Sequence, residues 1–177
     1  MMKELIASLI LAVPLWAQEI KFPANFSKLA DKAEDVVDVT LDTSMLGLAG
    51  RFLSSEKDDE ATAKRIIGGL KGIYIRSFEF SQPGQYSDAD VEDIRQQLRS
   101  PEWVRVLTVR SKKKNSDNAE IFLKKEGDRV SGLTLLASEP TKLTVVHILG
   151  SISVEDLGKL EGNFGIPRVK VTPEKEN

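Results

Sequence analysis

The chain has 177 residues, a formal net charge of −2, 41% hydrophobic and 29% charged residues, and no cysteine. These values exclude collagen-like, disulfide-stabilised and strongly disordered proteins, because the apolar content is ordinary and the charges nearly balance. They also exclude thiol catalysis and thiolate zinc sites, and they give no global electrostatic reason to expect binding to nucleic acid or an anionic membrane. The length fits one compact domain.

Residues 1–17 have the three-part layout of a secretory signal peptide. Lys3 precedes an apolar run, Pro14 breaks it, and Ala17 is a small residue suited to the position before a cleavage point. The apolar stretch is shorter than the roughly 20 residues that a membrane-spanning helix needs, so we expect no retained anchor and no transmembrane helix in the mature chain. We expect cleavage near Ala17 and a periplasmic or secreted protein; the alternative is a buried N-terminal helix.

The mature chain is expected to form a single α+β domain over residues 18–167, followed by a flexible C-terminal tail over residues 168–177. Its first half mixes helical and strand patterns. In chain order we expect a short helix at 28–33, a strand at 37–41, a helix with two glycines at 45–53, a helix whose apolar stripe ends at Leu70, and a strand at 72–80.

Strand patterns dominate the second half. Ser87 is expected to cap a helix that begins at Asp88 and ends before Pro101. The order favours an α+β fold with a mixed, mainly antiparallel sheet of about six strands and helices packed on one face. The remaining expected elements are strands at 103–111, 119–125, 130–139 and 143–152, joined by short turns, and a last helix capped by Ser153.

His147 is the only histidine, and it alternates with Leu143, Val145 and Leu149 in a strand pattern. Imidazole is a common general base near neutral pH. The apolar neighbours nevertheless favour a core or interface histidine over a catalytic one. No serine lies in a Gly-x-Ser-x-Gly pattern, and the sequence has no phosphate-binding or dinucleotide-binding loop. We therefore name no catalytic residue, no metal ligand and no cofactor.

An acidic cluster begins at Asp88 with the pattern Asp-x-Asp-x-Glu, which superficially resembles a calcium-binding loop. Such a loop needs a glycine at its sixth position and a bidentate glutamate at its twelfth. Asp93 and Arg99 occupy these positions here. The cluster is better explained by a helix N-terminus, where carboxylates meet the positive end of the helix dipole.

Residues 105–129 carry eight basic and four acidic side chains, so this segment is positive in a chain that is slightly negative. One interpretation is contact with an anionic group of envelope polysaccharide, phospholipid or an acidic partner. The other, which we favour, is a solvated hairpin whose basic side chains discourage edge-to-edge pairing of sheets. The candidate anion-binding residues are Arg105, Arg110, Lys112, Lys113, Lys114, Lys124, Lys125 and Arg129.

Several blocks of the chain together resemble one protein family: 70–80, 86–98, 103–112, 130–160 and 164–167. They are similar to the domain-of-unknown-function family 4252 of exported bacterial proteins, over roughly residues 22–167. The resemblance implies no assigned activity and no catalytic motif. Its members are often encoded beside extracytoplasmic sigma-factor systems, which implies an envelope-associated, regulatory setting. No cysteine follows the signal peptide here, so lipid attachment is not expected.

We expect an exported, non-enzymatic envelope domain that binds or regulates a partner. That partner would be an envelope protein or a second copy of the chain, and nucleic acid is not expected. A carboxylate-dependent hydrolase using Asp38, Asp42 or Glu79 is one alternative. Docking of the segment 105–129 to an anionic surface is the other.

Overall fold

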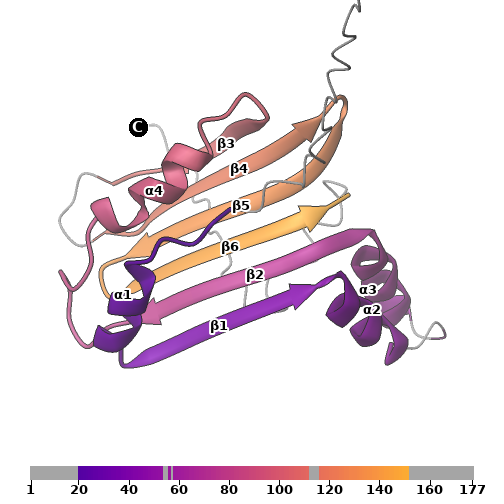
Figure 1. The fold of residues 1–177 in the computed structure, drawn as a ribbon, viewed down its shortest axis with the longest axis horizontal. Coiled ribbons are helices and arrows are strands. Elements are labelled where there is room, and N and C mark those ends of the chain that lie inside the picture. The colour runs from indigo at the N-terminus through magenta and orange to yellow at the C-terminus, as the bar shows by residue number, and fades with distance from the viewer. Residues whose placement is uncertain (1–19, 54–55, 57, 112–115, 152–177) are drawn as a thin grey trace, which may run out of the picture.

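A computed structural model describes residues 20–53, 56, 58–111 and 116–151. Within these ranges the chain forms four helices and one open six-stranded sheet, with every neighbouring pair of strands antiparallel (Figure 1). The strand order across the sheet is β1-β2-β6-β5-β4-β3. The helices are α1 (Phe26–Lys32), α2 (Thr43–Arg51), α3 (Asp58–Gly69) and α4 (Ala89–Gln97). The strands are β1 (Asp35–Asp42), β2 (Leu70–Glu79), β3 (Trp103–Val109), β4 (Asn118–Glu126), β5 (Arg129–Glu139) and β6 (Lys142–Gly150).

The strands β3 to β6 form a meander, because each strand pairs antiparallel with the next one along the chain. The β4–β5 turn contains Gly127, whose φ of 62° lies in the left-handed region that glycine tolerates best. β6 then pairs with β2 on its other side, so that Val146 faces Ile75 on one neighbour and Leu135 on the other. This central position explains why β6 is apolar on both faces.

One face of the sheet is covered by α1 and α4, which lie in front of it in Figure 1. The apolar stripe of α4, formed by Val91, Ile94 and Leu98, is buried against this face. Burying such side chains contributes roughly 1.5–3 kcal/mol each. The sheet and α1 supply most of the rest of this core, including Phe26, Leu29, Phe78, Phe122, Leu136, Leu143 and Val145.

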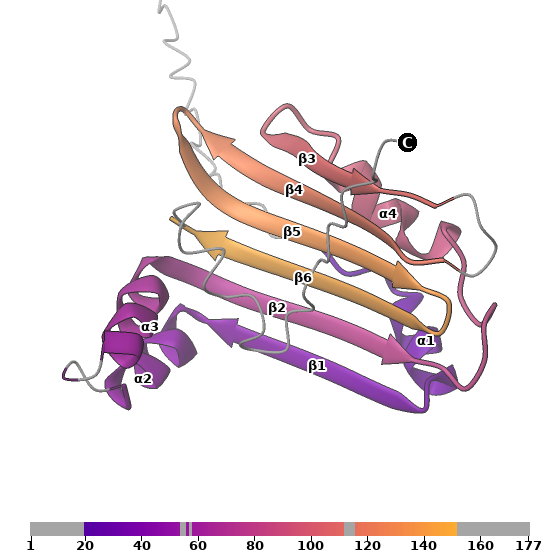
Figure 2. The ribbon, with the colours of Figure 1, turned by 180° about the vertical axis from the view of Figure 1, so that it is seen from behind.

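The other face packs against α2 and α3 at one end, as Figure 2 shows from behind. Leu46 of α2 and Ile67 of α3 belong to the same apolar cluster as Val146. Our expectation placed all helices on one face, whereas the structure divides them between two. The reason is topological: α2 and α3 connect β1 to the adjacent antiparallel strand β2, so they lie where β1 ends and β2 begins.

The predicted α+β class and the number of strands are confirmed, with a sheet that is antiparallel throughout. The expected cap of α4 needs one correction. Asp88 is the N-cap residue, and the carboxylate of Asp90 accepts a hydrogen bond from the Ser87 backbone N–H at 2.8 Å. The signal peptide, the last helix beginning at Ser153 and the tail at 168–177 lie outside the described residues. No helix of the described part is both long and apolar enough to span a bilayer.

Candidate functional site

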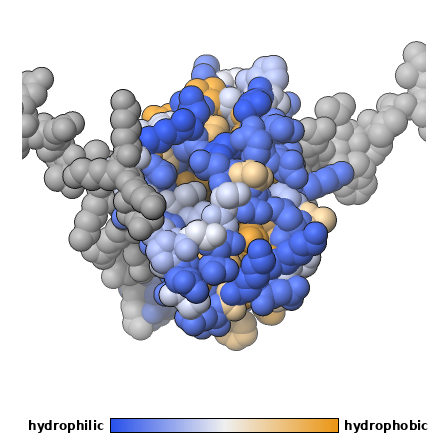
Figure 3. Space-filling model, turned by 90° about the vertical axis from the view of Figure 1, so that its left-hand side faces the viewer, coloured by the Kyte–Doolittle hydropathy of each residue, from blue (hydrophilic) through white to orange (hydrophobic). Residues whose placement is uncertain are grey.

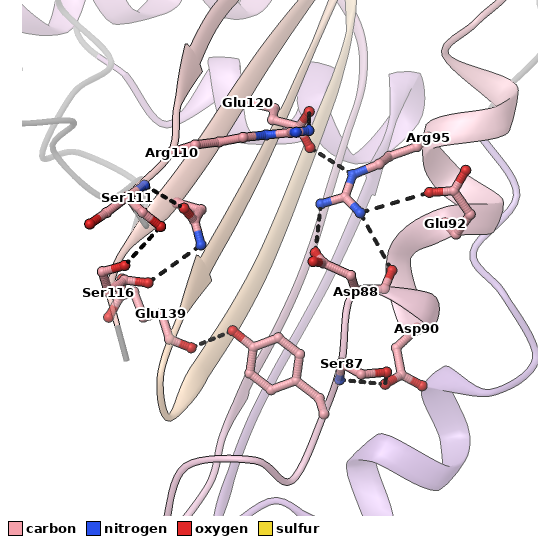
Figure 4. A network of polar contacts seen from close by, with 12 residues as sticks. Ser87, Asp88, Asp90, Glu92, Arg95, Arg110, Ser111, Ser116, Glu120 and Glu139 are labelled. Atoms are coloured by element: carbon pink, nitrogen blue, oxygen red, sulfur yellow. Dashed lines mark hydrogen bonds and ion pairs between the residues drawn. The ribbon is translucent and has the colours of Figure 1, made fainter. Parts of the chain in front are cut away.

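A polar cavity of about 420 Å³ lies between α4 and the neighbouring strands β4 and β5. Its charged side chains point toward one another from the helix and from the sheet (Figure 4). Serine, asparagine and a few apolar atoms complete the lining. The lining residues are Asp88, Glu92, Arg95, Arg110, Ser111, Asn118, Ala119, Glu120, Leu136 and Ser138.

Glu120 is the centre of this site. It lies on β4 opposite Leu136 of β5, and its side chain is only 4% exposed. Arg95 Nε donates a hydrogen bond to Glu120 Oε2 at 2.7 Å. On the other carboxylate oxygen, Arg110 Nη2 lies at 3.2 Å and Arg105 Nη1 at 3.4 Å. One buried carboxylate therefore holds three guanidinium groups, one from α4 and two from β3 and the residue that follows it.

The pKa of Glu120 reflects two opposing effects. Burial would raise it, but the hydrogen bond and charge of Arg95, followed by those of Arg110, lower it below its ordinary value. Burial similarly opposes the charge of Arg95, yet its bonds to Glu120 and Asp88 raise the pKa of this guanidinium above its already high value. Both groups are therefore ionised at neutral pH.

Arg95 links α4 to the sheet and is balanced by carboxylates of its own helix region. Its Nη2 lies 3.1 Å from Asp88 Oδ1, and its Nη1 lies 3.8 Å from Glu92 Oε2. The acidic cluster is thus used, in part, to neutralise a half-buried arginine. Among the described side chains, no group of three or more acidic residues or histidine is placed to hold a metal ion.

Arg105 and Arg110 differ from Arg95 in exposure, since their side chains are 54% and 62% accessible. Arg105 belongs to the edge strand β3, and Arg110 follows its last residue. Within the described chain, each makes a single polar contact, which is the one with Glu120 Oε1. Two half-exposed guanidinium groups are thus held at the same oxygen of Glu120, and Arg110 also lines the cavity.

The structure separates the rest of the predicted basic segment. Lys124 pairs with Glu102 at 3.5 Å. Lys125 and Arg129 flank the β4–β5 turn, at the opposite end of β4 from the residues that follow Arg110. The side chains of 112–114 lie outside the described residues. Of the eight candidates, the structure brings Arg105 and Arg110 together.

A second cavity of about 210 Å³ shares Asp88, Ser111, Asn118 and Ser138 with the first. It lies at the end of the sheet where most of the visible surface is hydrophilic (Figure 3). Tyr86 forms part of its wall and donates from its hydroxyl to backbone carbonyls of the β5–β6 turn region. Burial, with support from nearby carboxylates, raises the pKa of Tyr86 to about 12.

His147 is fully buried, which confirms the core interpretation. Its Nδ1 is 2.9 Å from the hydroxyl oxygen of Thr134, and the rings of Tyr74 and Trp103 lie within 6 Å of its own. Burial, followed by the charge of Lys124, lowers the pKa of His147 to about 4. The imidazole is therefore neutral at physiological pH.

The three carboxylates considered for hydrolysis occupy separate contacts. Asp38 pairs with Arg76 at 2.6 Å, and Asp42 accepts a hydrogen bond from the Met45 backbone N–H at the start of α2. Glu79 lies 3.2 Å from Lys142 Nζ. The structure does not bring these carboxylates together in the cavity beside α4.

Sequence reasoning missed Glu120 and Arg95. A signal for Glu120 was present, because it alternates with Phe122 on the face of β4 that packs into the core. A charged residue at such a position requires a partner. The sequence does not identify that partner, because Arg95 lies 25 positions away on a helix whose docking is not known beforehand.

Comparison with known proteins identifies a family. The model of the family described as "Domain of unknown function (DUF4252)" matches residues 27–160. This range includes α4, all six strands and every residue of the site around Glu120. Neither the curated proteins nor the solved structures contain a match to the chain.

Proposed function

The chain belongs to the DUF4252 family of unknown function, and from this premise we propose that it is an exported, non-enzymatic binding domain. It holds an anionic group of an envelope partner at Arg105 and Arg110. The single observation that supports this role is the pair of half-exposed guanidinium groups that share one oxygen of the buried Glu120.

The chemistry of arginine makes this pair suitable for recognising an anion. A guanidinium group has five N–H donors in a planar fork that matches a carboxylate or phosphate. Arg105 and Arg110 each use one contact on Glu120 and keep the rest of the fork accessible. Because Glu120 already orients both groups, an incoming anion has less side-chain freedom to remove, which favours affinity.

The local charge supports the same conclusion. Asp88 and Glu92 lie beside Arg95 on the helix side of the cavity. On the side of the edge strand β3, Arg105 and Arg110 share the single carboxylate of Glu120 with Arg95. Three lysines follow in sequence at 112–114 and add further positive charge to this segment. An anion approaching from the β3 side therefore meets an excess of positive charge.

Export is supported by residues 1–17, whose layout is that of a cleavable signal peptide. Expression of the full chain in a bacterium with a periplasm tests this part directly. Fractionation followed by N-terminal sequencing is expected to yield a periplasmic protein that begins at Gln18. An intact chain that begins at Met1 and remains in the cytosol would overturn export.

Binding can be tested with polyacrylate, a carboxylate polymer that has no peptide backbone. The variant Arg105→Gln/Arg110→Gln is expected to bind it about tenfold more weakly at low salt, since two charge-assisted contacts are lost. The matched control is Lys125→Gln/Arg129→Gln, which removes the same charge at the other end of β4. Equal weakening by both variants would mean that overall charge, rather than this site, controls binding.

A further inference from the structure

β3 is an edge of the sheet, because β4 is the one described strand that pairs with it. In an edge strand, alternate residues point their backbone N–H and C=O groups away from the sheet. Five of the seven residues of β3 are exposed. The strand therefore offers an accessible row of hydrogen-bonding groups directly beside the arginine pair.

The side chains of β3 combine apolar and basic character. Val104, Val106 and Val109 are 42%, 52% and 36% exposed, and they alternate with or flank Arg105 and Arg110. From residue 103 to residue 111 the sequence has two basic residues, Arg105 and Arg110, and no acidic one. A ligand that covers this edge must therefore supply negative charge and some small apolar surface.

The opposite edge of the sheet is arranged differently. β1 also exposes valines, but its charged residues are all acidic. The guanidinium of Arg76, on the adjacent strand β2, donates to the Val39 carbonyl at 3.0 Å and pairs with Asp38, so one of the acidic side chains of β1 already has a partner. No comparable side-chain bond to the backbone of β3 occurs within the part of the chain that the structure describes.

We propose that β3 is a docking edge, where an extended acidic segment of a partner protein adds to the sheet as a further strand. This inference rests on the proposed function and specifies its partner. Backbone hydrogen bonds would supply the pairing, carboxylates would contact Arg105 and Arg110, and small apolar side chains would cover the valines. The register shift between Arg105 and Leu107 divides the edge, which suits a short peptide better than the edge of another large sheet.

The test uses a synthetic peptide that alternates glutamate with valine, together with two versions that carry N-methyl groups on alternate backbone amides. In one version the methyl groups replace the hydrogens of the amide groups that face β3. In the other version they replace the hydrogens of the amide groups that point away from β3. Calorimetric titration is expected to show at least a tenfold loss of affinity for one version and little change for the other. If both methylated peptides bind as well as the parent, strand addition is wrong.

Protein variants test the same edge from the other side. Val106→Pro keeps both arginines but removes a backbone donor at the register shift, and it is expected to weaken peptide binding at least tenfold. Arg105→Gln/Arg110→Gln should also lose binding, whereas Lys125→Gln/Arg129→Gln should retain it. Circular dichroism checks that each variant is folded, and the methylated peptides decide the question if Val106→Pro is not.

The remaining outcomes separate this inference from the proposed function. One outcome is that the wild type binds polyacrylate and Arg105→Gln/Arg110→Gln does not, while the wild type fails to bind the parent peptide. This outcome would overturn strand addition but would still support an anion site at the two arginines. Vesicles of phosphatidylglycerol serve as the membrane probe. If the protein binds them more tightly than the peptide, and Val106→Pro binds them equally well, the partner is an anionic surface and the proposed peptide partner is wrong.

Discussion

Arg95 of α4 and Glu120 of β4 form a hydrogen-bonded ion pair of 2.7 Å, in which the side chains are 17% and 4% exposed. This contact links α4, which forms one side of the cavity, to β4, which carries the central carboxylate of the site. Because both side chains are largely removed from water, each charge is stabilised mainly by its partner rather than by solvent. A charge left without its partner in such a position is costly.

Glu120→Ala is therefore expected to lower the free energy of unfolding by about 3 kcal/mol, since it leaves the largely buried Arg95 without its shortest ion pair. Urea unfolding followed by circular dichroism measures this change. The double variant Arg95→Leu/Glu120→Leu should be less destabilised than Glu120→Ala, because it leaves no buried charge without a partner; the charges that lose a partner are the more exposed ones. If the double variant is the less stable of the two, the ion pair is not the source of the effect.

His147 should make stability depend on pH between about 6.5 and 4. Its pKa is lowered to about 4 in the folded state from 6.5 in an unperturbed histidine, so over this window the unfolded chain binds the proton more readily. Stability is therefore lost as the pH falls, by up to about 3 kcal/mol. Urea unfolding of the wild type and of His147→Gln at several pH values checks this. Parallel pH profiles for the two proteins would contradict the prediction.

Tyr86 connects the segment before α4 to the β5–β6 turn through its hydroxyl, which lies 3.0 Å from the Lys142 carbonyl. Tyr86→Phe removes this donor and is expected to destabilise the fold by about 1 kcal/mol. The raised pKa of Tyr86 adds a second signature. The unfolded chain ionises near pH 10 and the folded chain near pH 12, so the wild type should lose stability over this range and Tyr86→Phe should lose less. An unchanged alkaline profile would count against this role.

Gly127 can be tested without steric complications, because a Cβ placed there would meet no atom within 4 Å. Its φ of 62° is unfavourable for other residues, so Gly127→Ala is expected to cost about 1–2 kcal/mol. Gly127→Asn should cost less, since asparagine tolerates the left-handed region better than alanine does. Thermal unfolding of both variants measures the difference. Equal melting temperatures for Gly127→Ala and the wild type would contradict this account.

The strands could be predicted from the sequence because alternation and short turns are local signals. The burial of His147 followed from the same alternation, since its neighbours at 143, 145 and 149 are all apolar. The distribution of helices over two faces could not be predicted, because it depends on where β1 and β2 enter the sheet. That order is set by pairings between distant segments, such as Ile75 with Val146.

The candidate site was predicted only in part for a related reason. Arg105 and Arg110 belong to a segment that is visibly basic in sequence. Their meeting at Glu120 depends on the β3–β4 register, in which Thr108 faces Glu120. Arg110 lies near the first residues of β4, whereas Lys125 and Arg129 lie at its other end. The length of the extended strand therefore separates them from the arginine pair. Charge counting along the chain cannot detect this separation.

The central position of β6 also constrains the order of folding. β1 pairs with β2, and β3 to β5 form a separate run, but β6 is the strand that connects these two halves. Among the six strands it comes last from the ribosome. Joining β2 to β6 closes a long loop, and such non-local pairing slows folding. The sheet therefore cannot be completed before the ribosome has synthesised β6, which ends at Gly150. Until then the polypeptide should remain without its complete sheet. An incompletely folded chain is also the form that could pass through a narrow translocation channel.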